Sequence, residues 1–148
     1  MRYVRHTIWI ARTPEQVFDF FVDFPQSPRW RSYVRTMERL DEGPLREGSR
    51  LHVVMDVMGE SYAFDMEVLA CDRPRLWRHR TNEGDLRGYV EYRFEPADGG
   101  TTVSMTIVVH PDGIFGWLAM PLMLLQRNKP YAEQLPKLKR ALEGGDPS

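Results

Sequence analysis

The feature that most constrains the fold of this chain is a series of short turn signals that divides its middle into segments of alternating polarity. The turns are rich in glycine, proline and aspartate, and they fall at 41–44, 48, 58–60, 72–74, 83–85 and 98–100. Parallel neighbours would need connections of about a dozen residues or more, so turns this short favour antiparallel pairing. The sequence therefore predicts a mostly antiparallel meander.

The segments between these turns alternate as strands with one buried face do. Together with an opening strand at 3–10, we predict strands at 33–40, 49–57, 61–71, 75–81, 86–95 and 101–110. Successive side chains point to opposite faces, and we expect the less charged set to face the core. That set comprises Leu51, Val53, Met55, Val57, Tyr62, Phe64, Met66, Val68, Trp77, His79, Thr81, Tyr92, Phe94, Val103, Met105, Ile107 and Val109.

Helical signals stand on both sides of the meander. Thr13 and Gln16 have the spacing of a capping box, and a short aromatic helix follows until Pro25 and Pro28 stop it. From residue 114 to residue 142, apolar residues recur at helical spacing, which predicts one long C-terminal helix. Prolines within that stretch predict kinks or a break.

The order of these elements, together with several motifs, resembles one known superfamily. The motifs are 10–18 (IARTPEQVF), Trp30, 48–51 (GSRL), 71–76 (CDRPRL), 99–103 (GGTTV) and 135–139 (LPKLK). In this order they resemble the START/Bet v 1-like (SRPBCC) superfamily, and specifically its bacterial polyketide cyclase/dehydrase-like branch. The motifs mark a fold rather than a reaction.

The resemblance implies an α+β helix-grip fold. In this fold a curved, seven-stranded, mostly antiparallel sheet wraps around a long C-terminal helix, with two short helices between strands 1 and 2. We expect one ligand-binding domain over 1–145, with 146–148 as a tail. Members of the superfamily hold an apolar molecule between the sheet and the last helix. The expected function is therefore binding, extending to transport, of a lipid, polyketide or aromatic compound; the alternative is a polyketide cyclase or dehydratase.

We expect the ligand to contact large or polarisable residues of the inner face and of the last helix. These are Trp30, Met55, Tyr62, Phe64, Met66, Trp77, His79, Tyr92, Met105, Phe115, Trp117, Leu118, Met120 and Leu122. An ordinary filled core explains the same alternation, so that alternative stays open for each residue. His79 is the one candidate for catalysis, as a general base; it is also a candidate hydrogen-bond anchor or a structural residue.

Residues 114–125 are apolar on all sides, which is more than one buried helix face requires. As a helix this run would span roughly 18 Å, short of the roughly 30 Å core of a bilayer, so we expect no membrane insertion. The alternatives are a gate at the cavity mouth, a homodimer contact, a surface that touches membrane during loading, or burial alone.

The overall composition argues against several classes of function. Net charge is −1 from 20 basic and 21 acidic residues, so no overall field attracts nucleic acid. The histidines lack metal-ligand spacing and Cys71 is the single cysteine, so we expect no metal site and no disulfide. No nucleotide- or phosphate-binding motif is present, so we expect no cofactor. We expect a cytoplasmic protein.

Overall fold

The computed structural model describes residues 2–81, 86–111 and 132–144. The C-terminal helix occupies 132–143 of these. Before it, in chain order, come β1 (Arg2–Ile10), α1 (Pro14–Phe21), the 3-10 helix η1 (Phe24–Arg29), β2 (Val34–Arg39), β3 (Arg50–Val57), β4 (Glu60–Asp72), β5 (Leu76–Thr81), β6 (Leu86–Ala97) and β7 (Gly100–Pro111). The predicted strands are confirmed, each ending within two residues of its expected bounds.

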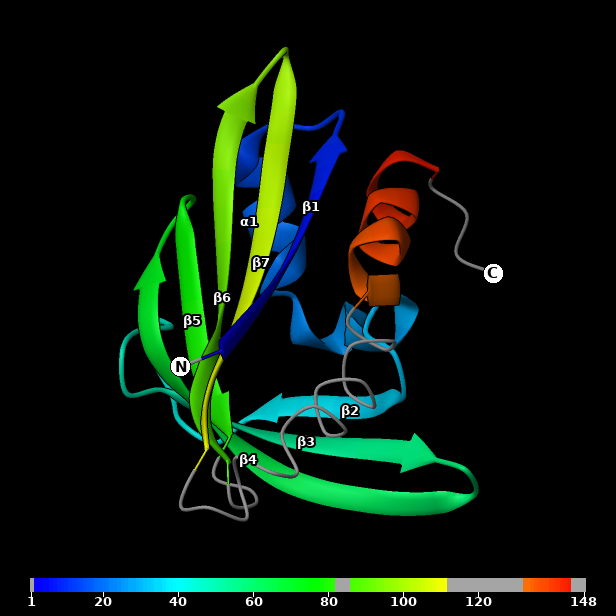
Figure 1. Ribbon diagram of the computed structural model, residues 1–148, viewed down its shortest axis with the longest axis vertical. Helices are drawn as coiled ribbons and strands as arrows, with labels where there is room; N and C mark the ends of the chain where they lie inside the picture. Colours follow the sequence, from blue (N-terminus) through cyan, green and yellow to red (C-terminus); the bar gives the residue numbers. More distant parts are fainter. Residues whose placement is uncertain (1, 82–85, 112–131, 145–148) are drawn as a thin grey trace.

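The strands form one seven-stranded antiparallel sheet in the order β1-β7-β6-β5-β4-β3-β2. From β2 to β7, neighbours in the chain are neighbours in the sheet, and β1 pairs with β7. Figure 1 shows the sheet bent so that β2 and β3 run across the direction of β1 and β7, with α1 and the C-terminal helix on the concave side. This is the helix-grip fold, as predicted. The expected extension of the last helix back to residue 114 lies outside the described residues.

Two hairpins owe their register to two-residue turns. Met58 and Gly59, between β3 and β4, have φ angles of 52° and 82°, and Asp98 and Gly99, between β6 and β7, have 49° and 79°. Two successive positive φ angles are typical of type I′ turns, whose twist matches that of paired strands. The turn signals in the sequence therefore fix which residues face each other across both hairpins.

The junction from β1 into α1 follows the predicted capping box. The Thr13 hydroxyl oxygen accepts from the Gln16 backbone N–H at 3.2 Å, and the Gln16 side chain accepts from the Thr13 N–H at 3.0 Å. These bonds satisfy two of the backbone donors that a helix start leaves open. They direct α1 onto the concave face, where Val17, Phe18 and Phe21 are buried.

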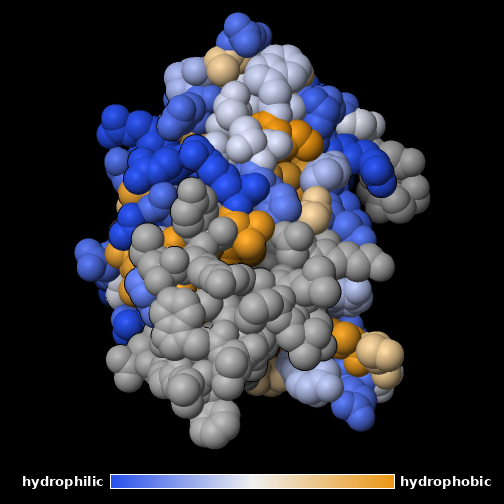
Figure 2. Space-filling model, in the orientation of Figure 1, coloured by the Kyte–Doolittle hydropathy of each residue, from blue (hydrophilic) through white to orange (hydrophobic). Residues whose placement is uncertain are grey.

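The convex face of the sheet carries the charged alternates of the buried residues. Arg80 pairs with Glu67 at 2.6 Å, and Glu91 lies between Arg78 and Arg93. In the view of Figure 2, which has the orientation of Figure 1, the described residues are mostly hydrophilic and the hydrophobic ones form separate small groups. The large hydrophobic residues that are exposed in the described chain are Trp9, Tyr33, Leu40, Met58 and Tyr62.

Candidate ligand-binding site

Two neighbouring rows of side chains cross the concave face and define the geometry of the candidate site. Strand register aligns one row as His6, Met105, Tyr92, Trp77 and Cys71. The next row, one step further from α1, comprises Val4, Ile107, Val90, His79 and Val68. The second row is apolar except for the imidazole of His79. His79 is therefore the polar side chain on this part of the concave face.

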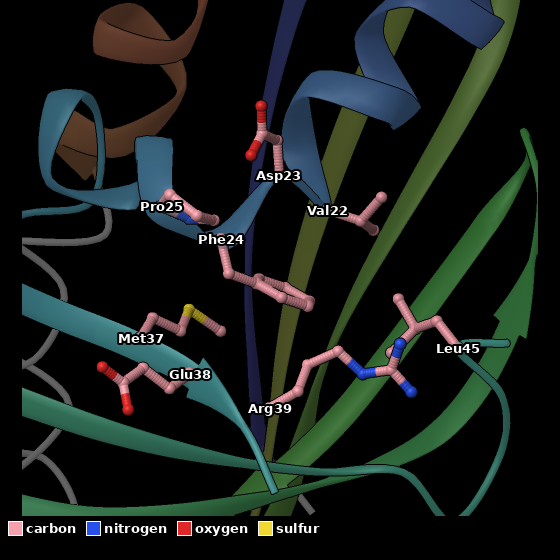
Figure 3. Close-up of a pocket in the computed structure, with 8 residues that line it drawn as sticks. All are labelled: Val22, Asp23, Phe24, Pro25, Met37, Glu38, Arg39 and Leu45. Atoms are coloured by element: carbon pink, nitrogen blue, oxygen red, sulfur yellow. The ribbon is translucent and has the colours of Figure 1, made fainter. Parts of the chain in front are cut away.

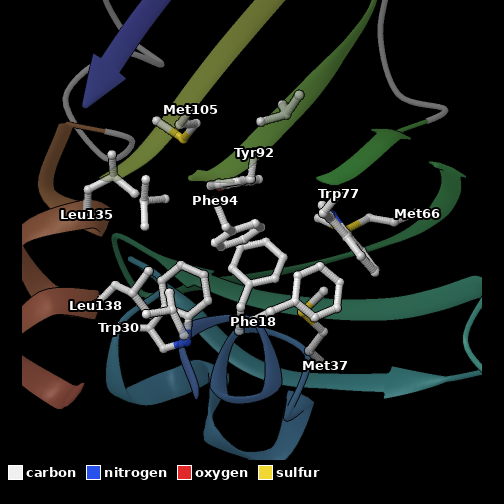
Figure 4. Close-up of a cluster of buried hydrophobic side chains, with 14 of the residues drawn as sticks. Phe18, Trp30, Met37, Met66, Trp77, Tyr92, Phe94, Met105, Leu135 and Leu138 are labelled. Carbon is white, nitrogen blue, oxygen red and sulfur yellow. The ribbon is translucent and has the colours of Figure 1, made fainter. Parts of the chain in front are cut away.

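Aromatic rings fill the interior on the α1 side of these rows (Figure 4). The Phe21 ring centroid lies 4.6 Å from that of Tyr92, 5.6 Å from that of Trp77 and 5.2 Å from that of Phe94. Phe18 packs edge-on against Phe94 at 5.3 Å. Rings at these spacings are in direct contact, so this end of the interior is a packed core.

His79 is 2% exposed, and a hydrogen bond fixes its tautomer. The indole Nε1–H of Trp77 donates to Nδ1 of His79 at 2.8 Å. An indole nitrogen can only donate, so Nδ1 carries no proton. Burial, with a smaller effect from the positive charge of Arg31, lowers the pKa of His79 to about 3. At neutral pH the ring is therefore neutral, its proton sits on Nε2, and it presents a donor to the interior.

Arg31 joins this site, although the residue pattern does not mark it as buried. Its residue is 5% exposed, and its guanidinium carbon lies 4.1 Å from the Trp30 ring centroid and 4.8 Å from that of Phe21. Charged residues that follow a helix end are usually solvated, so composition alone gives no reason to place it inside. Its one sequence signal is that it directly follows Trp30, a residue of the family motif set.

The C-terminal helix closes over the same region. Its buried Gln134 accepts a hydrogen bond from the Tyr92 hydroxyl through Oε1 at 3.0 Å, and Lys137 Nζ donates to the Ser32 hydroxyl at 3.4 Å. Leu135, on the same helix, is 1% exposed within the core. Polar and apolar contacts together hold the helix against the concave face.

Two hydrogen-bond donors in this interior lack a described acceptor. Trp30 is fully buried, and no acceptor in the described part of the chain meets its Nε1–H. For the His79 side chain, Trp77 is the only hydrogen-bond partner within residues 2–81, 86–111 and 132–144, and that bond leaves Nε2 unused. Most buried polar groups in proteins are hydrogen-bonded, so each of these two donors is an exception.

The other residues predicted to contact the ligand are buried to different extents. Met66 and Met105 are buried, and Met55 and Phe64 are half-buried against the core. Tyr62 is 50% exposed. Its hydroxyl donates to a carboxylate oxygen of Glu60 at 2.9 Å. Tyr62 shares the inward face but lies near the end of the β3–β4 hairpin, away from the buried group. Phe115, Trp117, Leu118, Met120 and Leu122, with the gate and dimer contact expected at 114–125, lie outside the described residues.

A separate cleft of about 520 Å³ opens at the β2 edge of the sheet (Figure 3). Its lining residues are Val22, Asp23, Phe24, Pro25, Met37, Glu38, Arg39 and Leu45. None of the predicted ligand contacts lines it. The rings of Phe24 and Trp77, with centroids 6.0 Å apart, stand between this cleft and the His79 row. The cleft is therefore a feature distinct from the concave-face site.

Two structural features bear on metals and membranes. Within the described ranges, no group of three or more histidine, cysteine or acidic side chains is arranged to hold a metal ion. None of the helices described for this chain has the length and apolar character needed to cross a membrane.

Comparison with known proteins adds family context to this geometry. A sequence model of the family described as "Polyketide cyclase / dehydrase and lipid transport" matches residues 1–143. No curated protein matches the chain.

Solved structures similar to the chain extend over almost its whole length. A protein from Thermus thermophilus, TTHA0849, has a TM-score of 0.77 and 23% identity, covering 98% of this chain and 99% of its own. A START superfamily protein from Mycobacterium smegmatis has 0.73 and 16%, covering 97% and 99%. The Zhui aromatase/cyclase from Streptomyces sp. R1128 has 0.71 and 18%, covering 96% and 93%. These likenesses support the helix-grip fold.

Proposed function

Because this chain belongs to the polyketide cyclase/dehydrase and lipid transport family, we propose that it binds a small hydrophobic ligand between the concave sheet face and the C-terminal helix. Lipids, polyketides and aromatic compounds are the classes in question. The ligand lies on the side of the Trp77–Tyr92 row away from α1, because aromatic rings already fill the α1 side.

The observation that carries this proposal is the unused Nε2–H donor of His79 on an otherwise apolar row of the concave face. The His79 Nε2–H would lose hydrogen bonds on folding unless an acceptor enters with a ligand. Val68 and Val90, which are 0% and 8% exposed, flank His79 along its row, and Ile107 lies beyond Val90. Predominantly apolar walls with a few placed polar groups are typical of small-molecule sites.

The same geometry favours holding a ligand over transforming it. A general base needs an available lone pair and a pKa near the working pH. In His79 the Nδ1 lone pair accepts from Trp77, Nε2 carries the proton, and burial lowers the pKa to about 3. His79 is therefore suited to donate a hydrogen bond to a ligand oxygen. A cyclase or dehydratase that relies on His79 as its base is not favoured.

The test is a titration with 1-aminoanthracene, a neutral apolar fluorophore, combined with native mass spectrometry of the purified protein. We expect saturable binding near one equivalent, and displacement by any apolar compound that copurifies.

A matched pair of variants locates the binding. Ile107→Trp adds bulk on the same row as His79, one strand beyond Val90, whereas Thr106→Trp places the same ring on the opposite face of β7. We expect at least a tenfold loss of affinity for the first variant and little change for the second. Absence of binding to the wild-type protein, or equal affinity for both variants, would contradict the proposal.

A further inference from the structure

Two buried side chains of β5 form a hydrogen-bonded pair beside the proposed ligand site. Trp77 and His79 are two residues apart, so both project from the concave face of the strand. The indole N–H of Trp77 donates to Nδ1 of His79 at 2.8 Å. An indole has a single N–H and no acceptor, so this bond uses the whole hydrogen-bonding capacity of the Trp77 side chain.

Aromatic contacts hold both members of this pair in place. The Trp77 ring packs edge-on against Phe21, with centroids 5.6 Å apart, and its centroid lies 6.0 Å from that of Phe24. The ring of Tyr92 stacks on His79, with centroids 6.4 Å apart and planes 27° apart. Side chains in a close-packed interior have little room to rotate. The bond between the two rings therefore has a fixed direction.

This bond decides which group His79 presents to a ligand. A neutral imidazole carries its proton on one nitrogen and accepts at the other, and the partner of one nitrogen sets the state of the second. Because Trp77 donates to Nδ1, the proton is on Nε2. The two nitrogens lie on different sides of the ring, so the Nε2–H is directed away from Trp77. Moving the proton to Nδ1 would place two N–H groups against each other and cost the bond.

The neighbours of His79 leave the polar part of ligand recognition to this one group. Val68 and Val90 flank it on β4 and β6, and Ile107 lies beyond Val90 on β7. Their side chains can contact any apolar surface, whereas the Nε2–H can pair only with an acceptor. A ligand that brings an N–H to this point would leave two donors facing each other without an acceptor.

We propose that Trp77 is a positioning residue: by holding the proton of His79 on Nε2, it makes the site select ligands with an oxygen acceptor over ligands with an N–H donor. Trp77 acts through His79 and gives no hydrogen bond to the ligand itself. This inference rests on the proposed function and adds to it the residue that determines which polar group of an apolar ligand is accepted.

The experiment compares two flat three-ring compounds of nearly equal size, 9-fluorenone and carbazole. At the same position, the first has a carbonyl and the second an N–H. Each displaces 1-aminoanthracene from the wild-type protein and from Trp77→Phe. We expect the wild-type protein to bind fluorenone about tenfold more tightly than carbazole, since a mismatched buried donor is costly. In Trp77→Phe either imidazole nitrogen can carry the proton, so this ratio should fall at least threefold.

The ratio of the two affinities separates positioning from packing. A loss of packing alone weakens both compounds together and leaves their ratio unchanged. Phe24→Leu is the matched control, because it removes a ring that packs on Trp77 but leaves the indole N–H and its bond to His79. This variant should keep the wild-type ratio.

Nitrogen-15 NMR of the histidine side chains reads the tautomer directly, with the His79 signals assigned by their absence from His79→Gln. We expect His79 to be protonated on Nε2 in the wild-type protein and to exchange between both tautomers in Trp77→Phe. The wild-type spectrum serves even if Trp77→Phe does not fold, and protonation of His79 on Nδ1 would overturn the inference.

The outcomes separate this inference from the proposed function. If the wild-type protein binds neither 1-aminoanthracene nor either three-ring compound, the proposed function fails and this inference fails with it. If both compounds bind the wild-type protein equally, or if the ratio is the same in Trp77→Phe, the proposed function stands and the positioning role of Trp77 is wrong.

Discussion

Acidification should destabilise this protein through His79. Burial lowers the pKa of His79 from 6.5 to about 3 in the folded protein. The unfolded chain therefore takes up this proton first as pH falls. Above about pH 6.5 the ring is neutral in both states, and His79 does not lower the free energy of unfolding. Between about pH 6.5 and pH 3 only the unfolded chain binds the proton, so the free energy of unfolding falls progressively.

The size of the effect follows from these two pKa values. Between pH 7.5 and pH 5.0 the unfolded histidine becomes almost fully protonated while the folded one stays neutral, which lowers the free energy of unfolding by about 2 kcal/mol. Asp19, whose pKa is held low by its hydrogen bond to Arg73, titrates below this window. A measurement that stops at pH 5.0 therefore stays above the range in which Asp19 titrates.

Urea unfolding at constant ionic strength, followed by tryptophan fluorescence, measures this loss. In His79→Gln the amide can still accept from Trp77 but cannot titrate, so we expect its stability to change about 2 kcal/mol less than that of the wild-type protein over the same interval. His110→Gln, at an exposed position of β7, should keep the wild-type dependence. A His79→Gln protein that loses stability as steeply as the wild-type protein would refute the reasoning.

Three further substitutions test the packing around the site. Gly88→Ala would bring its methyl group against the carbonyl oxygen of Val108, so we expect urea unfolding to show a free energy of unfolding lower by about 3 kcal/mol or more. An unchanged free energy of unfolding would contradict the close approach of β6 and β7. Thr13→Ala removes the cap bond to Gln16 and should cost about 1 kcal/mol; no measurable change would mean that the cap is dispensable. Leu138→Ala leaves a cavity under the C-terminal helix, and we expect the free energy of unfolding to fall by about 2–5 kcal/mol. A fall below about 1 kcal/mol would show that the helix is loosely docked.

The fold was predictable because its signals are local. A two-residue turn such as Met58-Gly59 sets the register of its hairpin, and alternation along each strand then assigns the faces. His79 lies inside for the same reason, since Arg78 and Arg80 on either side of it belong to the outer face. These inferences need only residues close together in the chain.

The polar part of the site was not predictable in the same way. Arg31 and Gln134 are separated by about a hundred residues in sequence, and they meet the His79 region only once η1 and the C-terminal helix pack on the sheet. Tyr62 shows that alternation predicts the face of a side chain but not how deeply it is buried. Alternation gives its face correctly, but its 50% exposure depends on how far the β3–β4 hairpin extends beyond its covering elements.

The pairing of β1 with β7 bears on how the chain folds as it is synthesised. Strands β2 to β7 can each pair with the strand before them in the chain. The pairing of β1 with β7 instead joins residues far apart in sequence, such as Arg2 and Val109. Closing a loop of roughly 100 residues costs about 2–3 kcal/mol more entropy than closing a short turn. The first strand to leave the ribosome is therefore among the last to dock, and its alternating apolar side chains stay uncovered until β7 has formed.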